Sequence, residues 1–314
     1  MALDAALGLQ AAAALGERGV ALVGEAGLAA ATAERLAGAR VVVLAWDGDP
    51  EPVEALEARL PAGAELVGLL PPVGLNRLIQ LVAGSPMNHV FTADPADPPA
   101  AAPWLRATIA KVRGGEPFGL DRYLAAAAPQ GAAVIDDYAG RSRVLAELLA
   151  FAERADLRAQ VRSHIAGACD ELMMNALYDA PVDEAGRPVF ADLDVKRRIA
   201  RRSPRKVSVR YGGDRAGFAV AVRDGFGRLD KETVVRHIER CLRRPAPIDD
   251  TRQGAGLGLF LVLCAASHVV VSVDPGRGTE VICQFDRDGV RGGLRGLSIF
   301  VAGGAAGARA RSVG

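Results

Sequence analysis

Short apolar runs alternate with segments of helical periodicity through the first third of the chain. The runs GVALVG, RVVVLAW, ELVGLL and HVFTA predict strands at residues 19–24, 40–46, 65–70 and 89–93. Between and around them, apolar residues recur at helical spacing, which predicts helices at residues 4–17, 28–37, 53–60, 75–82 and 104–113. Strands of this length that alternate with helices are typical of βαβ units, so we expect a parallel sheet.

The pattern changes in the second part of the chain. A helix is expected from about residue 157, an apolar strand ends at Asp224, and another strand opens at Gly278. The most apolar stretch, residues 257–273, is interrupted by Ser267 and His268, so it predicts a buried helix followed by a buried strand rather than a membrane span. The whole chain is therefore expected to be α/β, with no membrane partner.

Length and composition divide this pattern into domains. A chain of 314 residues, half of them hydrophobic and 5% aromatic, suggests two α/β domains with closely packed layers. We place the first at residues 1–115 and the second at 116–288, followed by a tail at 289–314 rich in Gly, Arg and Ala. Within the tail, the apolar run at 297–301 is the segment that could add an edge strand.

Charge and cysteine content restrict the partners and the compartment. With 38 basic and 37 acidic residues the net charge is +1, which gives no overall reason to expect nucleic acid. The basic run at 195–206 is either a dock for an acidic partner or a solvated loop, and we favour the loop because no aromatic residues interleave with it. Four widely spaced cysteines and the absence of a signal-peptide pattern favour the reducing cytoplasm.

The first domain resembles a response-regulator receiver domain that lacks its first strand. VALVGEAG is similar to the second strand and turn of such domains, and RVVVLAWDGDP to the third strand with its acidic end. Asp47 stands near the phosphoacceptor position, but Leu70-Pro71 replaces the hydroxyl residue and residues 92–95 replace the Lys-Pro. Without the acidic pair there is no Mg²⁺ site, so the resemblance implies a degenerate, protein-binding domain with Asp47 as a loop residue.

Two polar residues on one helix face suggest chemistry in the second domain. Glu171 and Asn175 are four residues apart in CDELMMNALYDAP, so they share a face. Asn175 offers a neutral oxygen to Mg²⁺, and Glu171 can orient or deprotonate an attacking group. The alternative is an ordinary amphipathic helix whose polar side faces water.

A second motif follows the strand that ends in Asp224-Gly225-Phe226-Gly227. A buried carboxylate at this position can accept a hydrogen bond from the exocyclic amine of adenine, and it disfavours guanine, which presents a carbonyl there. Gly225 and Gly227 allow the backbone to turn close to a ligand. The same four residues also form a common turn.

A glycine-rich segment leads directly into the apolar helix. Gly254, Gly256, Leu257 and Gly258 stand where backbone N–H groups at the helix start can bind phosphate oxygens. A Rossmann motif would need a preceding strand, whereas the stretch before these glycines is polar and contains proline. Thr279, at the start of the later strand, is expected beside Asp224.

Together these motifs resemble those of the GHKL ATPases. The resemblance covers residues 120–288 and implies a Bergerat-fold α/β sandwich with a mixed sheet that binds ATP or ADP with Mg²⁺. It implies Asn175 on Mg²⁺, Glu171 as base, Asp224 with Gly225, Gly227 and Thr279 at the adenine, and the segment from Gly254 through Gly256 and Leu257 to Gly258 at the phosphates. Family members often carry a basic residue three positions after the Asn, where this chain has Tyr178.

Three functions follow from this resemblance. We expect a signalling protein whose ATPase domain phosphorylates an unidentified regulatory partner on Ser or Thr, or sequesters it in an ATP-dependent way. The alternative is a non-catalytic, ATP-gated binding module or scaffold. A third hypothesis, a phosphorelay through His164 or Asp47, has less support because His164 lacks an acidic neighbour. The partner, the signal and the oligomeric state, including a homodimer, stay open.

Overall fold

The computed structural model describes residues 20–93, 102–214, 217–242, 257–289 and 293–302. The helix expected at residues 4–17 lies outside this part. The chain forms two compact units, the first made of the chain up to Pro117 and again from Arg295, the second of Phe118–Leu294. The division after Pro117 falls two residues beyond the expected boundary. The fold class is α/β with parallel and antiparallel strand pairs, as expected.

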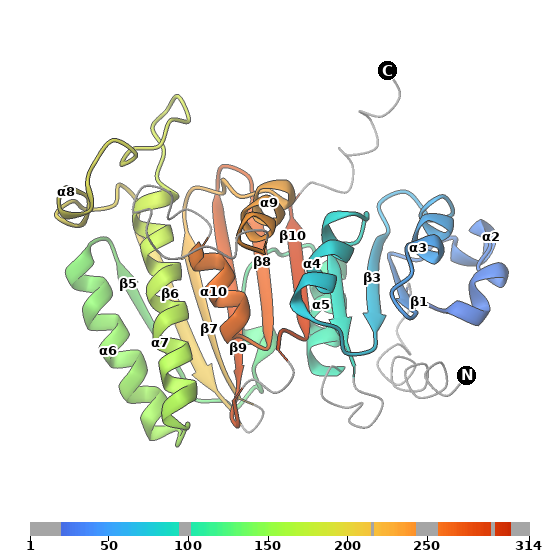
Figure 1. The fold of residues 1–314 in the computed structure, drawn as a ribbon, viewed down its shortest axis with the longest axis horizontal. Helices are drawn as coiled ribbons and strands as arrows, with labels where there is room; N and C mark the ends of the chain where they lie inside the picture. The colour runs from blue at the N-terminus through green and yellow to red at the C-terminus, as the bar shows by residue number, and fades with distance from the viewer. Residues whose placement is uncertain (1–19, 94–101, 215–216, 243–256, 290–292, 303–314) are drawn as a thin grey trace. The chain divides into compact units, whose positions relative to one another are not determined.

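The first unit contains four parallel strands that lie side by side in chain order. They are β1 (Val20–Gly24), β2 (Val41–Ala45), β3 (Glu65–Leu70) and β4 (His89–Thr92). The connecting helices are η1 (Glu25–Ala30), α2 (Ala33–Leu36), α3 (Pro50–Glu57), α4 (Leu75–Ala83) and α5 (Ala102–Gly114) (Figure 1). Every residue of β2 is buried, which explains why these strands are continuous apolar runs in the sequence. The parallel sheet predicted for this region is confirmed.

The loop after β2 uses its own carboxylates to hold its shape. Asp47 is exposed, and its Oδ1 accepts the N–H of Asp49 at 3.0 Å. Asp49 in turn caps α3 by accepting the N–H of Glu51 at 3.1 Å, and its carbonyl accepts the indole N–H of Trp46 at 2.8 Å. Asp47 therefore has the contacts of a loop-forming residue.

The C-terminal segment belongs to the first unit rather than to a separate tail. Strand β10 (Gly296–Val301) pairs antiparallel with β4, with Leu297 opposite Val90. The side chains of Leu297 and Ile299 are almost completely buried. The apolar run at 297–301 therefore does form a strand, and four of the six residues of β10 are buried. Residues from 303 onward lie outside the described part.

Close packing at Gly68 fixes the spacing of β2 and β3. A Cβ atom at Gly68 would lie 2.6 and 2.7 Å from two ring carbons of Trp46 and 2.9 Å from the sulfur of Met87. The exposed fractions of Trp46 and Met87 are 2% and 0%, so neither side chain has room to withdraw.

We therefore expect Gly68→Ala to destabilise the first unit by about 1–3 kcal/mol, the usual cost of overpacking a core. Urea unfolding of the full chain measures this change. Gly74→Ala is the matched control, because no atom lies within 4 Å of its added Cβ and its φ is −69°. Equal midpoints for the two variants would show that the close contact at Gly68 is not a constraint.

The sheet of the second unit has the order β8-β9-β7-β6-β5. Its strands are β5 (Gln130–Ile135), β6 (Val207–Gly213), β7 (Gly217–Asp224), β8 (His268–Asp274) and β9 (Gly278–Asp286). All four neighbouring pairs are antiparallel, whereas a mixed sheet was expected in this unit. β7 and β8 run in the same direction, but β9 lies between them, so their long connection creates no parallel pair.

Three helices cover one face of this sheet: α6 (Tyr138–Arg154), α7 (Ala159–Met174) and α10 (Leu257–Ala265) (Figure 1). The others are η3 (Leu120–Tyr123), the π-helical turn η4 (Asn175–Asp179), α8 (Val195–Ile199) and α9 (Lys231–Leu242). α7 packs between α6 and α10 through buried residues that include Ile165 and Leu172. Among the described residues, no helix combines the length and apolarity needed to cross a membrane.

Candidate functional site

Three segments that are distant in the sequence border one cavity of the second unit. The cavity has a volume of 330 Å³, and Asn175, Asp224 and Thr279 all line it. Much of the remaining wall is apolar, with Leu172, Val222, Leu259 and Val281 among its residues. A small, mostly apolar cavity with a few polar groups is the usual form of a small-molecule site. The polar residues singled out in the sequence are thus brought together.

Asp224 is a fixed acceptor at the end of β7. Its exposed fraction is 8%, and its Oδ1 accepts the N–H of Phe226 at 2.7 Å and of Gly227 at 3.3 Å. Thr279 lies opposite it in the register of β7 and β9. Burial raises the pKa of Asp224, and hydrogen bonds from Phe226, Gly227 and Thr279 partly offset this rise. The side chain of Asp224 is therefore held in a fixed orientation at the cavity.

Of the two glycines after Asp224, Gly227 stands where another part of the backbone comes so close that a side chain would not fit. Its φ is +63°, and an added Cβ would lie 2.8 Å from the nitrogen of Gly276 and 2.9 Å from that of Gly278. The DGxG turn thus packs directly on the turn between β8 and β9. Gly225 lies elsewhere than expected, because it borders a different pocket, with its carbonyl bound by Arg205.

At the end of α7 a π-helical turn brings three polar side chains together. The N–H of Ala180 donates to the carbonyl of Asn175 at 2.8 Å, which closes the wider turn. The carboxamide nitrogen of Asn175, in the orientation that satisfies both neighbours, donates to Glu171 Oε1 at 3.2 Å and to Asp179 Oδ2 at 2.9 Å. In this orientation the carboxamide oxygen no longer faces the two carboxylates. π-Helical turns are frequent at functional sites.

Sequence analysis missed Asp179 as a site residue. It directly follows Tyr178 in CDELMMNALYDAP, and its position four residues after Asn175 was a signal that it shares the same helix face. In the structure Asp179 lines the cavity and pairs with Arg198 of α8 at 3.0 Å. Burial raises the pKa of Asp179, and the positive charge of Arg198 opposes this rise.

Glu171 has the electrostatic surroundings of a proton acceptor. Burial raises the pKa of its carboxyl group most, and the negative charge of Asp179 raises it further. The hydrogen bond from Asn175 and the charge of Arg198 act in the opposite direction. A carboxyl group whose pKa is raised toward neutrality is better suited to general base catalysis than an exposed one.

The first turn of α10 lies against this carboxylate. A Cβ atom added at Gly258 would overlap the side chain of Glu171, so a larger residue there would require that side chain to move. Leu257 begins this helix, whereas Gly254 and Gly256 lie outside the described residues.

Most residues of the basic run are exposed, as expected for a solvated segment, although residues 195–199 form α8 and several arginines make contacts within the second unit. Four of its arginines contact other parts of the second unit: Arg197 pairs with Asp194, Arg198 with Asp179, Arg202 with Asp136 and Asp137, and Arg205 lies over the ring of Phe226. Two of these contacts, those of Arg198 and Arg205, reach the site motifs themselves. The basic run therefore contacts residues of the candidate site, although it does not line the cavity itself.

These residues fit the nucleotide and metal that the motifs imply. Asp224, Thr279 and Asn175 line the cavity, whereas Glu171 does not line it but lies beside Asn175 and against Gly258. Within the described residues, no group of three or more His, Cys, Asp or Glu is placed to hold a metal ion. The metal-binding role of Asn175 stays a prediction.

Comparison with known proteins adds no relative. No protein-family model matches the chain, and no curated protein matches its sequence. The likeness to GHKL ATPases therefore depends on the ordered motifs and on the geometry described above, and it stays a resemblance.

The raised pKa of Glu171 leads to a prediction about stability. Because the ionised carboxylate is less favourable in the folded protein than in the unfolded chain, stability is lost as the pH rises through the raised pKa. We expect Glu171→Gln to melt at a higher temperature than the wild type at about pH 8, with the difference shrinking toward about pH 4, where both states carry a protonated carboxyl group.

Thermal melts over this pH range are the measurement. Glu147→Gln serves as the control, because Glu147 is an exposed residue of α6 that is paired only loosely with Arg143, at 3.9 Å. A Glu171→Gln variant that is less stable than the wild type at high pH, or whose difference does not change with pH, would contradict the electrostatic assignment.

Proposed function

We propose that the second unit binds ATP with Mg²⁺ in the 330 Å³ cavity and that the protein is a regulatory ATPase or Ser/Thr protein kinase of the GHKL type. The observation that carries this proposal is the grouping of Asn175, Asp224 and Thr279 around one cavity, with Glu171 against the start of α10. Each residue matches a motif in the expected order, and none is close to the others in sequence except Glu171 and Asn175.

Bound ATP would supply the phosphoryl group, with Mg²⁺ neutralising part of its charge. In this proposal Asp224 accepts a hydrogen bond from the adenine amine and so selects the base. The oxygen of Asn175 faces the cation, and the free N–H groups of α10 face the phosphate end. Glu171 accepts the proton of the attacking water or partner hydroxyl group.

A second candidate, an ATP-gated module without catalysis, is favoured by the surroundings of Tyr178. Its ring meets Phe190 edge to face at 5.7 Å, and its hydroxyl group donates to the carbonyl of Arg201 at 3.4 Å. Position 178 thus provides packing instead of the cation often found there in the family. Arg198 does bring a cation to this corner, but it is paired with Asp179. Slow or absent phosphoryl transfer would follow from this arrangement.

The cysteines support a reducing compartment such as the cytoplasm. Cys169, Cys264 and Cys283 are free thiols in the described part of the chain.

The proposed partner is a regulatory protein whose identity the sequence does not give. The phosphorelay hypothesis gains no support, since Asp47 uses its carboxylate within its own loop and His164 lies on the same helix as Glu171.

Nucleotide choice tests the binding half of the proposal. We expect ATP and ADP to bind at least about tenfold more tightly than GTP, a difference of roughly 1.4 kcal/mol, because the Asp224 carboxylate would face the carbonyl of guanine. Asp224→Asn should lose most of this affinity, whereas Asp192→Asn, at an exposed loop position, should not. Isothermal titration calorimetry measures the affinity of the wild type for ATP, ADP and GTP, and the affinity of the two variants for ATP. Equal affinities for ATP and GTP would rule out the assigned role of Asp224.

Single-turnover loss of the γ-phosphate separates the enzyme from the ATP-gated module. If Glu171 is the base, Glu171→Gln should keep ATP affinity within about threefold and lower the rate by roughly 10²-fold or more. Asn175→Ala should weaken both binding and rate, because it removes a group that would hold the metal in the ground state.

The ion pair of Arg198 provides a matched comparison on α8. Arg198→Ala releases Asp179 and should slow turnover, whereas Arg197→Ala breaks only the exposed pair with Asp194 and should leave the rate unchanged.

Identical slow rates of γ-phosphate loss for the wild type and Glu171→Gln would exclude a base at Glu171, and the ATP-gated module would then be the better account.

A further inference from the structure

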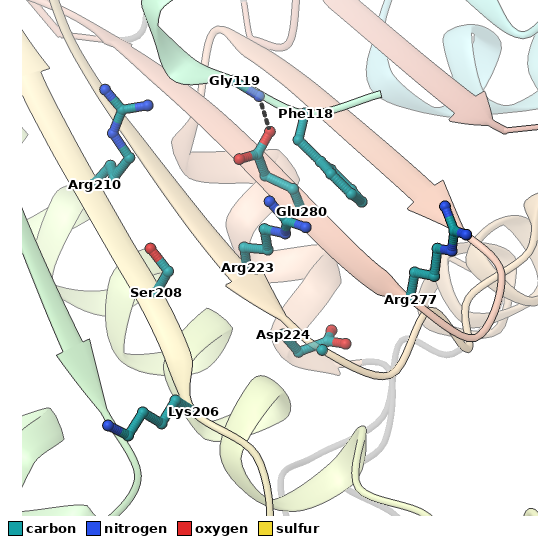
Figure 2. Close-up of a pocket in the computed structure, with 10 residues that line it drawn as sticks. Phe118, Gly119, Lys206, Ser208, Arg210, Arg223, Asp224, Arg277 and Glu280 are labelled. Carbon is teal, nitrogen blue, oxygen red and sulfur yellow. Dashed lines mark hydrogen bonds between the residues drawn. The ribbon is translucent and has the colours of Figure 1, made fainter. Parts of the chain in front are cut away.

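The second unit has another cavity, of 440 Å³, on the face of the sheet opposite the candidate nucleotide site (Figure 2). Side chains alternate between the faces of a strand, so Val222 of β7 lines the first cavity and Arg223 the second. β9 behaves in the same way, with Val281 on one side and Glu280 on the other. This second cavity is therefore separate from the predicted nucleotide site, apart from Asp224, which borders both.

Its lining is rich in cations that lack a close anion. Lys206, Arg210, Arg223 and Arg277 all line it, together with the hydroxyl group of Ser208. Arg210 is neutralised by Asp121 through two hydrogen bonds of 2.8 and 2.6 Å. Lys206 and Arg223 form no ion pair with any residue in the described part of the chain, and Arg277 reaches Asp274 only at 3.9 Å.

The two carboxylates of this lining are already engaged by backbone donors. Glu280 is 4% exposed, and its Oε1 accepts the N–H of Gly119 at 2.8 Å, shown as the dashed line in Figure 2. Asp224 accepts the N–H groups of its own turn. Glu280 lies opposite Arg223 in the register of β7 and β9, but the four cations of the lining outnumber its two carboxylates, which leaves positive charge for a ligand.

Arg223 is exposed at the cavity and stacks on an aromatic ring. Its guanidinium group lies over the ring of Phe118, 3.9 Å from the ring centroid. Stacking of this kind covers the flat face of the guanidinium group and leaves its N–H edge for an anion. Figure 2 shows Lys206 and Arg277 on opposite sides of Arg223, so one small monoanion does not contact all three.

We propose that this cavity binds a small polyphosphorylated anion. Its volume suits a small molecule, and three separated cations with a hydroxyl group suit a ligand that carries more than one phosphate group. Nucleic acid fits less well, because the only aromatic residue of the lining, Phe118, has one face occupied by Arg223 and provides no platform for successive bases. The inference does not depend on ATP binding in the other cavity.

Calorimetry with tripolyphosphate on the full chain, without Mg²⁺, tests this proposal. Tripolyphosphate should bind with an affinity that falls as salt is added. Arg223→Ala and Lys206→Ala should each weaken binding by about tenfold, whereas Arg223→Lys, which keeps the charge, should weaken it less. Arg236→Ala is the matched control, because Arg236 is an exposed cation of α9 that pairs with Glu232 at 2.7 Å.

Circular dichroism of each variant establishes that the fold is retained. Failure of wild-type protein to bind tripolyphosphate, or equal affinity in the double variant Lys206→Ala/Arg223→Ala, would overturn the proposal. Tighter binding of a hexaglutamate peptide than of tripolyphosphate would also overturn it and would assign the surface to an acidic protein partner. If ATP binding alone fails, tripolyphosphate should still bind, so the two proposals can be judged separately.

Discussion

One carboxamide holds two carboxylates side by side at the end of α7. The charge of Asp179 raises the pKa of Glu171, and Asn175, which donates a hydrogen bond to each carboxylate, opposes this rise. The rest of the site depends on that arrangement. The π-helical turn brings Asp179 close to Asn175, α8 supplies Arg198 as a counter-charge, and Gly258 of α10 leaves the space that the Glu171 side chain occupies.

Features that depend on local pattern could be predicted from the sequence, and features that depend on distant partners could not. The strand at residues 65–70 was predicted to the residue, because a buried parallel strand is a short apolar run between turn signals. Asp224 and Thr279 were expected together because each stands at a strand end. The π-helical turn could not be predicted, because one wide turn does not change the spacing of apolar residues along the helix. The ion pairs of the basic run also escaped, because their carboxylates lie far away in the sequence.

The second cavity had a signal in the sequence that was not used. Arg223 is a single charge within an otherwise apolar strand, and Glu280 has the same place in the next strand of the sheet. Because side chains alternate between the two faces, a lone charge in such a strand indicates that the opposite face is polar at that level. The sequence was instead interpreted for one face only, the face on which the motif residues lie.

Charge balance at the first cavity determines which form of nucleotide the proposed function requires. Asp179 and Asp224 line the cavity and Glu171 lies beside its residue Asn175, whereas Arg228 lines the cavity and Arg198 pairs with Asp179. Arg198 is already committed to Asp179, so the protein alone offers the phosphates little positive charge beyond the start of α10. A free triphosphate would meet net repulsion at this end, and Mg²⁺ would remove it by adding two positive charges beside Asn175. Under the proposed function, the nucleotide therefore binds as its magnesium complex, with the carboxylates favouring the cation as strongly as they disfavour the uncomplexed phosphates.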